Sequence, residues 1–205
     1  MIGYYNYTVI LTYIGMISGF VGITAIGNGE LKTSLICLMV AAFCDMFDGK
    51  VASTMKRTPQ EKRFGVQIDS LSDLICFGVL PALIILHCTE KSLIHVIISA
   101  TYVLCALIRL AWFNVDEEER QNHESGSREV YLGLPVTTAA ALIPFYIGLS
   151  GMMNLPLGTI SSIVLLAIAV AFISPIKMKK PGNVGKIVLV LVGFLALAVV
   201  LMGVA

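Results

Sequence analysis

The sequence predicts an all-α integral membrane protein, a polytopic bundle of six core transmembrane helices with one further helix at the C-terminal side. Three observations carry this prediction. The 205 residues are 57% hydrophobic and only 13% charged, whereas soluble domains carry about 25% charged residues. The apolar residues gather in seven stretches, each close to the ~20 residues that a spanning helix needs. Most connections are short, so one domain over residues 1–205 accounts for the chain.

The predicted helices are separated by two polar connections of some length. The first apolar run lacks the preceding basic residues of a cleavable signal, so we take it as the first spanning helix. A basic loop at 54–64 separates the second helix from the third. A loop at 114–132, which holds the acidic run 116–119, separates the fourth from the fifth. The seven helices are predicted at 8–26, 33–53, 67–88, 92–113, 133–150, 157–176 and 184–204.

The placement of lysine and arginine predicts the orientation, because cytoplasmic loops carry an excess of these residues. A cytoplasmic N-terminus puts only Lys32 and Lys91 on the outer side. We therefore expect the N-terminus inside and the C-terminal helix to end outside, in a bacterial plasma membrane. The inner side then holds Lys56, Arg57, Lys62, Arg63, Arg120, Arg128, Lys177, Lys179, Lys180 and Lys186.

Four aspartates interrupt this apolar background. Asp45 and Asp48 lie three residues apart near the end of the second predicted helix, and Asp69 and Asp73 lie four apart at the start of the third. Each pair shares one helix face, and the loop 54–64 joins the two helix ends. We therefore expect all four carboxylates to converge just inside the cytoplasmic boundary. An ionisable group in a membrane helix costs at least ~2.5–3.5 kcal/mol, so these residues are functional candidates.

Four carboxylates can stay ionised together only if a cation lies between them. Oxygen ligands suit Mg²⁺, Mn²⁺ or Ca²⁺ rather than zinc, and the three histidines lie elsewhere in the sequence. Two metal ions clamped by carboxylates are suited to phosphoryl transfer. Gly49 and Gly65 leave room for a phosphate or a neighbouring backbone, and the cations of 54–64 attract an anionic head group.

The stretch from Asp45 to Asp73 resembles the CDP-alcohol phosphatidyltransferase signature, D-x-x-D-G-x-x-A-R-x(about 8)-G-x-x-x-D-x-x-x-D. The matching positions are Asp45, Asp48, Gly49, Ala52, Gly65, Asp69 and Asp73. The sequence departs from the signature twice: Ser53 stands where the family has arginine, and the spacer 54–64 is longer than usual. Downstream, SDLICFGVLPA (72–82), RLAWFNV (109–115) and LGLPVTTAAA (132–141) are similar to segments of the family's phosphatidylserine synthase branch.

The resemblance implies a dimeric bundle with a polar cavity open to the cytoplasm. The hydroxyl of L-serine would attack the β-phosphorus of CDP-diacylglycerol, giving phosphatidylserine and CMP, with Mg²⁺ or Mn²⁺ present as two ions. Asp73 would also be the base that accepts the hydroxyl proton. The metal ligands would be Asp45, Asp48, Asp69 and Asp73, and the residues around the CDP-lipid would be Gly49, Ala52, Ser53, Gly65, Lys56 and Arg57.

Arg109 is a candidate for binding the acceptor. It lies in an otherwise apolar helix, where a buried cation needs an anionic partner. The serine carboxylate, a lipid phosphate or one of the aspartates would serve. The alternative is that Arg109 extends to the nearby cytoplasmic boundary. Asn114 and Thr137 would complete an amino-acid pocket. Membrane lipids are the expected surroundings, and no nucleic-acid partner is expected.

Three alternatives stay open at this point. One alternative acceptor is glycerol 3-phosphate or an inositol phosphate, which would call for a basic pocket where the predicted helices offer only Lys50 and Arg109. An ion-coupled transporter would use the aspartates as a cation site, but such sites lie near the bilayer midplane in broken helices. Ser53 also motivates a catalytically silent relative that only binds the CDP-lipid.

Overall fold

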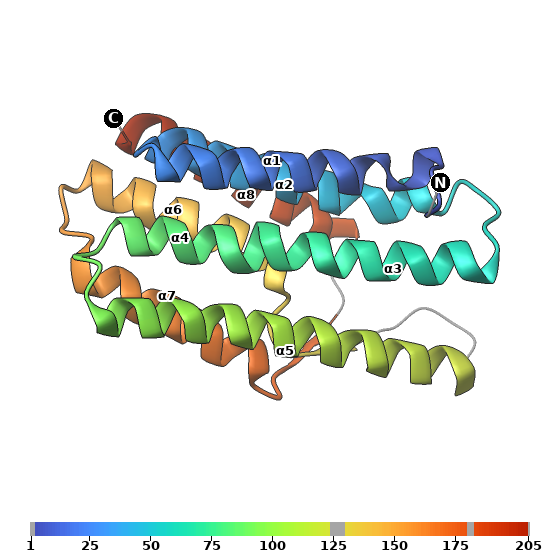
Figure 1. Cartoon of the computed structure of the whole chain (residues 1–205). Helices are drawn as coiled ribbons and strands as arrows, with labels where there is room; N and C mark the ends of the chain where they lie inside the picture. The colour runs from blue at the N-terminus through green and yellow to red at the C-terminus, as the bar shows by residue number, and fades with distance from the viewer. Residues whose placement is uncertain (1–2, 124–129, 180–182, 205) are drawn as a thin grey trace.

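The helices pack side by side along one axis, with the N-terminus at one end of the bundle and the C-terminus at the other (Figure 1). The computed structural model describes residues 3–123, 130–179 and 183–204. The predicted all-α fold is confirmed for these residues. The helices are α1 Ile10–Gly27, α2 Leu31–Ala52, α3 Pro59–Asp73, α4 Leu80–His87, α5 Leu93–His123, α6 Ala139–Met152, α7 Gly158–Ile173 and α8 Asn183–Gly203.

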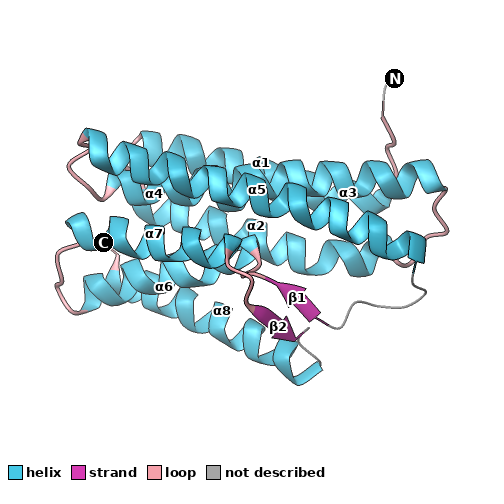
Figure 2. Ribbon diagram, turned by 90° about the horizontal axis from the view of Figure 1, so that it is seen from below, coloured by secondary structure: helices cyan, strands magenta, loops and turns pink. Residues whose placement is uncertain are grey.

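The third predicted helix is one rod made of three parts. A π-helical turn, Leu74–Val79, joins α3 to α4 without a break, so the described chain still forms seven rods as expected. Short 3₁₀ turns at Tyr7–Val9 and Val136–Thr138 precede α1 and α6. Two short strands, β1 Val130–Leu132 and β2 Lys177–Lys179, were not predicted. They pair antiparallel with Tyr131 opposite Met178 (Figure 2).

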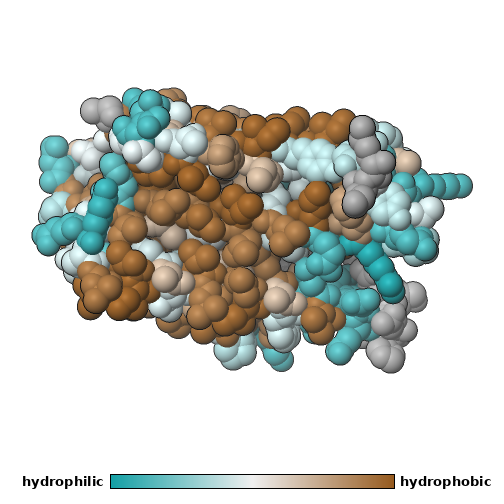
Figure 3. Space-filling model, viewed as in Figure 1, coloured by the Kyte–Doolittle hydropathy of each residue, from teal (hydrophilic) through white to brown (hydrophobic). Residues whose placement is uncertain are grey.

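The surface and the helix lengths fit a multi-pass membrane protein. Apolar residues cover the middle of the face shown in Figure 3, and polar residues gather toward its two ends. Among the described residues, three helices are long and apolar enough to cross a membrane: Tyr7–Gly27, Pro59–His87 and Leu93–Arg120. Shorter apolar helices cover Val136–Met152, Gly158–Ile173 and Val190–Gly203.

Helix α1 lies unusually close to its neighbours because glycines face them. A Cβ on Gly19 would lie 2.6 Å from Cys76 Sγ in the π-helical turn, and one on Gly15 would lie 3.4 Å from Cys44 Cβ on α2. A larger residue at position 19 would therefore push the helices apart. This close packing brings α1 against the parts of α2 and α3 that carry the aspartates.

The predicted start of the third helix was wrong. Helix α3 begins at Pro59 rather than at 67, so Gly65 is helical and the connection from α2 is only a few residues long. Thr58 and Glu61 form a capping box: Thr58 Oγ1 accepts from the Glu61 N–H at 3.3 Å, and Glu61 Oε2 accepts from the Thr58 N–H at 2.8 Å. Pro59 at the first helical position supports this start.

The predicted loop 114–132 was also wrong over its first half, because α5 continues to His123. The acidic run 116–119 is therefore helical. Within this extension, Arg120 pairs with Glu117 at 2.6 Å, and Glu118 lies 3.7 Å from Arg63 on α3. Arg128 and Lys180, which were used to predict the orientation, lie outside the described residues.

The segment before α6 is a turn and not the start of a helix. Gly133 has φ +76°, and its N–H donates to the Ile176 carbonyl at 2.8 Å. The Leu134 N–H donates to the Ala171 carbonyl at 3.1 Å, near the end of α7. Helix α6 consequently begins at Ala139 rather than at 133. The turn thus holds the chain that follows α5 against the end of α7, which the sequence predicts to face the cytoplasm.

Candidate active site

Three of the four aspartates meet at one point between α2 and α3. One carboxylate oxygen each from Asp45, Asp48 and Asp69 lies within 4.8 Å of the others. Asp73 lines the same small cavity. The predicted convergence of the two aspartate pairs is therefore what the structure shows. The remaining wall is formed by Leu11, Thr12, Gly15, Ala41, Ser72, Cys76 and Phe77.

The cavity lies deeper along α3 than expected. Asp69 follows Pro59 by ten residues, which corresponds to about 15 Å of helix at about 1.5 Å per residue. The sequence had placed both Asp69 and Asp73 at the very start of this helix. Asp45 and Asp48, in contrast, lie near the end of α2 as expected. The first turns of α3 therefore extend past the carboxylates.

The chemistry of the donor set suits a divalent cation. Carboxylate oxygens of like charge at this separation repel one another strongly in a site of low dielectric. A doubly charged cation between them removes that repulsion, and hard cations such as Mg²⁺ prefer oxygen ligands. The residues present thus fit the metal that the sequence predicts.

Thr12 is a site residue that the sequence analysis missed. Its Oγ1 donates to Asp48 Oδ2 at 3.3 Å from α1, and its carbonyl accepts from Ser72 Oγ at 3.5 Å. The signal available was a hydroxyl in an apolar helix. Ser18 and Thr24 on the same helix share that signal and donate to backbone carbonyls of Cys37 and Val21, so the signal did not single out Thr12.

Around the rim, the motif residues of α2 are accessible. Gly49 is exposed, and a Cβ there would meet nothing within 4 Å. Ser53, which stands in the arginine position of the motif, is exposed at the end of α2, and its Oγ donates to the Lys50 carbonyl at 2.7 Å. Ala52 is half-buried and Lys56 is exposed.

Arg57 reaches the other motif glycine. Its Nη1 lies 3.2 Å from where a Cβ of Gly65 would stand. Its Nε is enclosed and has no hydrogen-bond partner among the described residues. The sequence analysis had placed Arg57 and Lys56 around the CDP-lipid. Of these side chains, Arg57 is the one that contacts a motif residue across the α2–α3 connection.

Arg109 is buried, with 7% exposure, in the middle of α5, beside the Gly133 turn. Its guanidinium carbon lies 5.9 Å from the Trp112 ring centre and 5.3 Å from that of Phe113. Its Nε would lie 3.2 Å from a Cβ on Gly133. This burial does not fit a side chain extended into solvent. Arg109 is not among the residues that line the carboxylate cavity.

The other two acceptor candidates lie on different elements, Asn114 on α5 and Thr137 in the 3₁₀ turn before α6. Asn114 Oδ1 accepts from Ser70 Oγ at 3.0 Å, directly beside Asp69 on α3. Thr137 is half-buried in the 3₁₀ turn before α6. Neither lines the carboxylate cavity. The structure thus brings Asn114 next to the metal-site helix and leaves Arg109 and Thr137 near the turn at Gly133.

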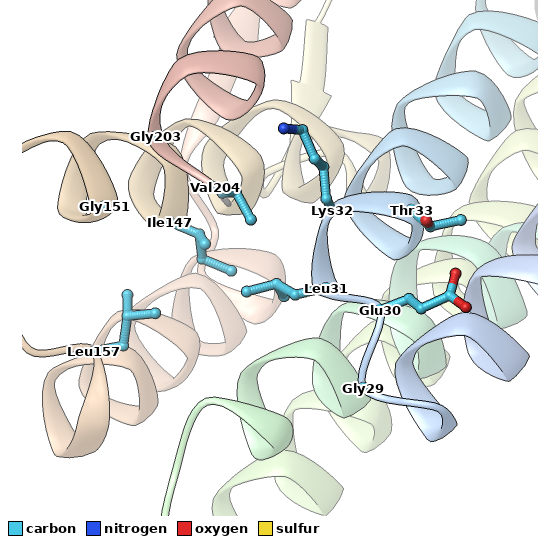
Figure 4. A pocket seen from close by; sticks show the side chains of 10 residues that line it. All are labelled: Gly29, Glu30, Leu31, Lys32, Thr33, Ile147, Gly151, Leu157, Gly203 and Val204. Atoms are coloured by element: carbon cyan, nitrogen blue, oxygen red, sulfur yellow. The ribbon is translucent and has the colours of Figure 1, made fainter.

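A larger cleft of about 510 Å³ lies at the opposite end of the bundle (Figure 4). Apolar side chains of Leu31, Ile147, Leu157 and Val204 point into it. Lys32 also borders the cleft, and its Nζ donates to the Leu201 carbonyl at 3.4 Å. The cleft has no cluster of carboxylates, so the smaller cavity is the candidate active site.

The described residues thus form an apolar helical bundle with four motif aspartates around one cavity. Residues 5–204 match the sequence model of the CDP-alcohol phosphatidyltransferase family. The chain belongs to this family. The family generally uses divalent metals, in agreement with the carboxylate cluster.

Among its relatives, the chain is 30% identical over 178 residues to the archaetidylserine synthase of Methanothermobacter thermautotrophicus, covering 86% of this chain and 70% of that protein. It is 33% identical over 142 residues to the CDP-diacylglycerol–serine O-phosphatidyltransferase of Saccharomyces cerevisiae, covering 64% of this chain and 50% of that protein. An enzyme of the same name from Methanocaldococcus jannaschii is 30% identical over 171 residues, covering 83% and 74% of the two chains.

Proposed function

We propose that this protein transfers a phosphatidyl group from CDP-diacylglycerol to the hydroxyl of L-serine, giving phosphatidylserine and CMP. The observation that carries the proposal is that the four motif aspartates, from two helices, line one cavity. The family membership favours this transfer over the ion-coupled transporter considered from the sequence. A cation site alone would not require the motif residues Gly49, Ala52 and Gly65.

Serine is favoured as the acceptor by the names of the relatives. The archaeal and yeast proteins differ in the lipid that their names give, an archaetidyl or a diacylglycerol group, and agree on serine. Glycerol 3-phosphate and an inositol phosphate would each bring a phosphate group. The apolar helices predicted from the sequence offer only Lys50 and Arg109 to neutralise one. In the structure the first turns of α3 add Lys62 and Arg63, both exposed, so the choice of serine rests on the names of the relatives.

Asp45, Asp48, Asp69 and Asp73 would hold the divalent metal, Mg²⁺ or Mn²⁺, as a pair of ions. When bound, the ions would balance the charge of the pyrophosphate and of the leaving CMP. The Thr12 hydroxyl fixes one carboxylate of this set, because it donates to Asp48 Oδ2. A carboxylate held in this way has fewer orientations to lose when a ligand binds.

Asp73 is proposed as the base. A serine hydroxyl is a weak nucleophile until a carboxylate within hydrogen-bond reach accepts its proton. The serine oxygen then forms a bond to the β-phosphorus, the bond from that phosphorus to the CMP oxygen breaks, and Asp73 holds the proton. Asp73 is the last residue of α3 and lines the cavity together with Cys76 and Phe77 of the following turn.

Arg57 is proposed to contact the phosphates of the CDP-lipid in place of the motif arginine. It lies against Gly65, and its enclosed Nε has no hydrogen-bond partner among the described residues. The exposed Lys56 and the Ser53 hydroxyl lie on the same connection and add polar groups near the rim. Gly49 and Ala52 present little side chain to the nucleotide, which favours close approach.

We further propose a plasma-membrane location with the active site facing the cytoplasm, the N-terminus inside and two copies per assembly. The support for the orientation is the excess of lysine and arginine in the loops that share a side with the 53–58 connection. The dimer rests on the family resemblance alone.

The test of the proposed function compares acceptors. Purified protein in lipid nanodiscs receives CDP-diacylglycerol, Mn²⁺ and one radiolabelled acceptor at a time, and the label entering the lipid fraction is measured. We expect label from L-serine and none above background from glycerol 3-phosphate or myo-inositol phosphate. Transfer to either phosphorylated acceptor instead of serine would disprove the serine assignment. CDP-lipid binding without transfer to any acceptor would make the protein a silent relative.

A further inference from the structure

The helix that carries Asp69 and Asp73 changes its hydrogen-bond pattern directly after Asp73. Residues Leu74–Val79 form a π-helical turn, in which the Leu80 N–H donates to the Ile75 carbonyl, five residues back. Such widened turns inside α-helices occur frequently at functional sites. The change in pattern rotates the faces of the helix before and after the turn relative to each other. The orientation of Asp73 toward the cavity therefore depends on this turn.

A proline follows the turn, and a tyrosine of α5 contacts it. Pro81 has no N–H, so it cannot donate to the carbonyl of Phe77 four residues earlier, as an ordinary α-helical residue would. The Tyr102 hydroxyl on α5 donates to that carbonyl at 2.7 Å. Phe77 itself lines the carboxylate cavity. The tyrosine thus bonds the widened turn at a residue that lines the cavity.

The surroundings of Tyr102 hold its hydroxyl in place. Its side chain has 0% exposure, and its ring centre lies 5.3 Å from that of Phe172 on α7. One turn further along α5, Ala106 Cβ would lie 3.5 Å from a Cβ on Gly78, so α5 lies close to the π-helical turn. Tyr102 does not line the cavity. It has no direct contact through which to take part in the reaction.

We propose that Tyr102 is a positioning residue for the metal site: its bond to the Phe77 carbonyl keeps the widened turn Leu74–Val79 in place and thereby aims Asp73 at Asp45, Asp48 and Asp69. The proposal rests on the proposed function of the cavity as a metal-dependent active site. It adds to the site a residue of α5, a helix outside the aspartate motif. Tyr102 acts through a backbone carbonyl and does not bond to a carboxylate.

The test measures Mn²⁺ binding without any substrate. Tyr102→Phe removes the hydroxyl and keeps the ring, and the loss of free Mn²⁺ signal in electron paramagnetic resonance gives the affinity of the folded protein in nanodiscs. We expect affinity about tenfold weaker than in the parent protein, as for other residues that orient metal ligands. In the transfer reaction we expect kcat to fall by about the same factor and the KM for serine to change less than about twofold.

Tyr146→Phe is the matched control. The Tyr146 hydroxyl is 3.2 Å from Ser161 Oγ, between α6 and α7 and away from the cavity. Its loss removes a tyrosine hydrogen bond without touching the turn, so Mn²⁺ affinity and kcat should stay unchanged. If Tyr102→Phe leaves both quantities at the parent values, the proposal is wrong, whatever happens to thermal stability.

A second variant covers the case in which Tyr102→Phe does not accumulate. Pro81→Ala supplies an N–H four residues after Phe77 and favours the ordinary α-helical pattern, at a position where alanine is a better helix former than proline. We expect a folded protein with weakened Mn²⁺ binding. An Mn²⁺ affinity equal to that of the parent protein would overturn the proposal.

Because Mn²⁺ binding needs no substrate, a parent protein that binds Mn²⁺ and transfers to no acceptor refutes the proposed function and leaves this test intact. A parent protein that does not bind Mn²⁺ refutes the positioning role.

Discussion

The carboxylates of the cavity lie closer together than their mutual repulsion favours, and the Thr12 side chain bonds to one of them. Three oxygens of like charge lie within 4.8 Å of one another, and repulsion at this separation is strong away from bulk water. Thr12 reduces the freedom of one of them through its bond to Asp48. The residue scale is therefore where the proposed metal site is most sensitive to change.

Thr12→Val tests this directly, because it removes the hydroxyl and keeps the branched shape. We expect CMP release to fall about tenfold, since residues that orient a metal ligand are worth 10–100-fold in affinity or activity. Thr12→Ser keeps the donor and should retain most of the activity. Equal activity in the valine and serine variants would show that the bond to Asp48 is not used.

Arg109 gives the second residue-scale prediction. If the buried guanidinium binds the serine carboxylate, Arg109→Gln raises the KM for serine by about tenfold or more, because a charge-assisted hydrogen bond contributes about 1.5–3 kcal/mol. The KM for CDP-diacylglycerol should change little. Steady-state kinetics with each substrate varied in turn separates the two constants. A loss of thermal stability with both KM values unchanged would assign Arg109 to the packing around Gly133, Trp112 and Phe113.

At the scale of elements, helix ends were harder to predict than helix positions. Each of the seven apolar stretches contains a helix in the structure, since hydrophobic length is a strong signal in membrane proteins. The ends of α3 and α5 were misplaced because the added turns are polar, which an apolar criterion excludes. Thr58, Pro59 and Glu61 carried the missed signal for α3, a capping box with a proline at the first turn.

The convergence of the aspartates, in contrast, could be predicted, because it does not depend on where the helices end. The spacing of Asp45 with Asp48 and of Asp69 with Asp73 fixes one helix face for each pair, whatever the exact helix ends. The contributions of Thr12 and Tyr102 were not predictable, because both come from other helices through tertiary packing. The π-helical turn was equally hidden: Pro81 indicates a missing bond in the helix, and the sequence does not show which donor replaces it.

Thr58→Ala removes the side-chain half of the capping box and tests the revised start of α3. We expect a loss of about 1 kcal/mol at this helix end, which should make the connection open more often. Trypsin cleavage after Lys56 or Arg57 in nanodiscs should then be several times faster than in the parent protein. Gln60→Ala, an exposed change in the same turn that leaves the cap intact, should cleave at the parent rate. Equal rates in both variants would contradict the cap.

At the scale of the whole molecule, the seven rods place the two ends of the described chain at opposite ends of the bundle (Figure 1). The carboxylate cavity lies toward the end that carries the N-terminal segment, where Tyr7 OH is 2.9 Å from Thr54 Oγ1 and Asn6 Nδ2 donates to Glu61 Oε1 at 3.2 Å. The larger apolar cleft lies at the other end. The orientation in the membrane therefore decides which compartment supplies serine.

Fusions to alkaline phosphatase, which is active only outside the cytoplasm, test that orientation. We expect activity from a fusion at Lys91 and from one placed after α8, and none from a fusion at Lys56. These expectations follow from the excess of lysine and arginine on the proposed inner side. The reverse pattern of activity would place the cavity on the outer side.

The most direct test of the central claim, that the four aspartates form a metal-dependent transfer site, is serine-dependent CMP release by the purified protein while Mn²⁺ is titrated from zero. We expect no release without metal, release that saturates with Mn²⁺ and with serine, and loss of at least about a hundredfold in Asp73→Asn. Mn²⁺ binding by Asp73→Asn should be weakened at least as much as in Tyr102→Phe. Glu118→Gln, an exposed carboxylate on α5, should behave as the parent protein. CMP release that is independent of metal, or that survives in Asp73→Asn at the parent rate, would contradict the account.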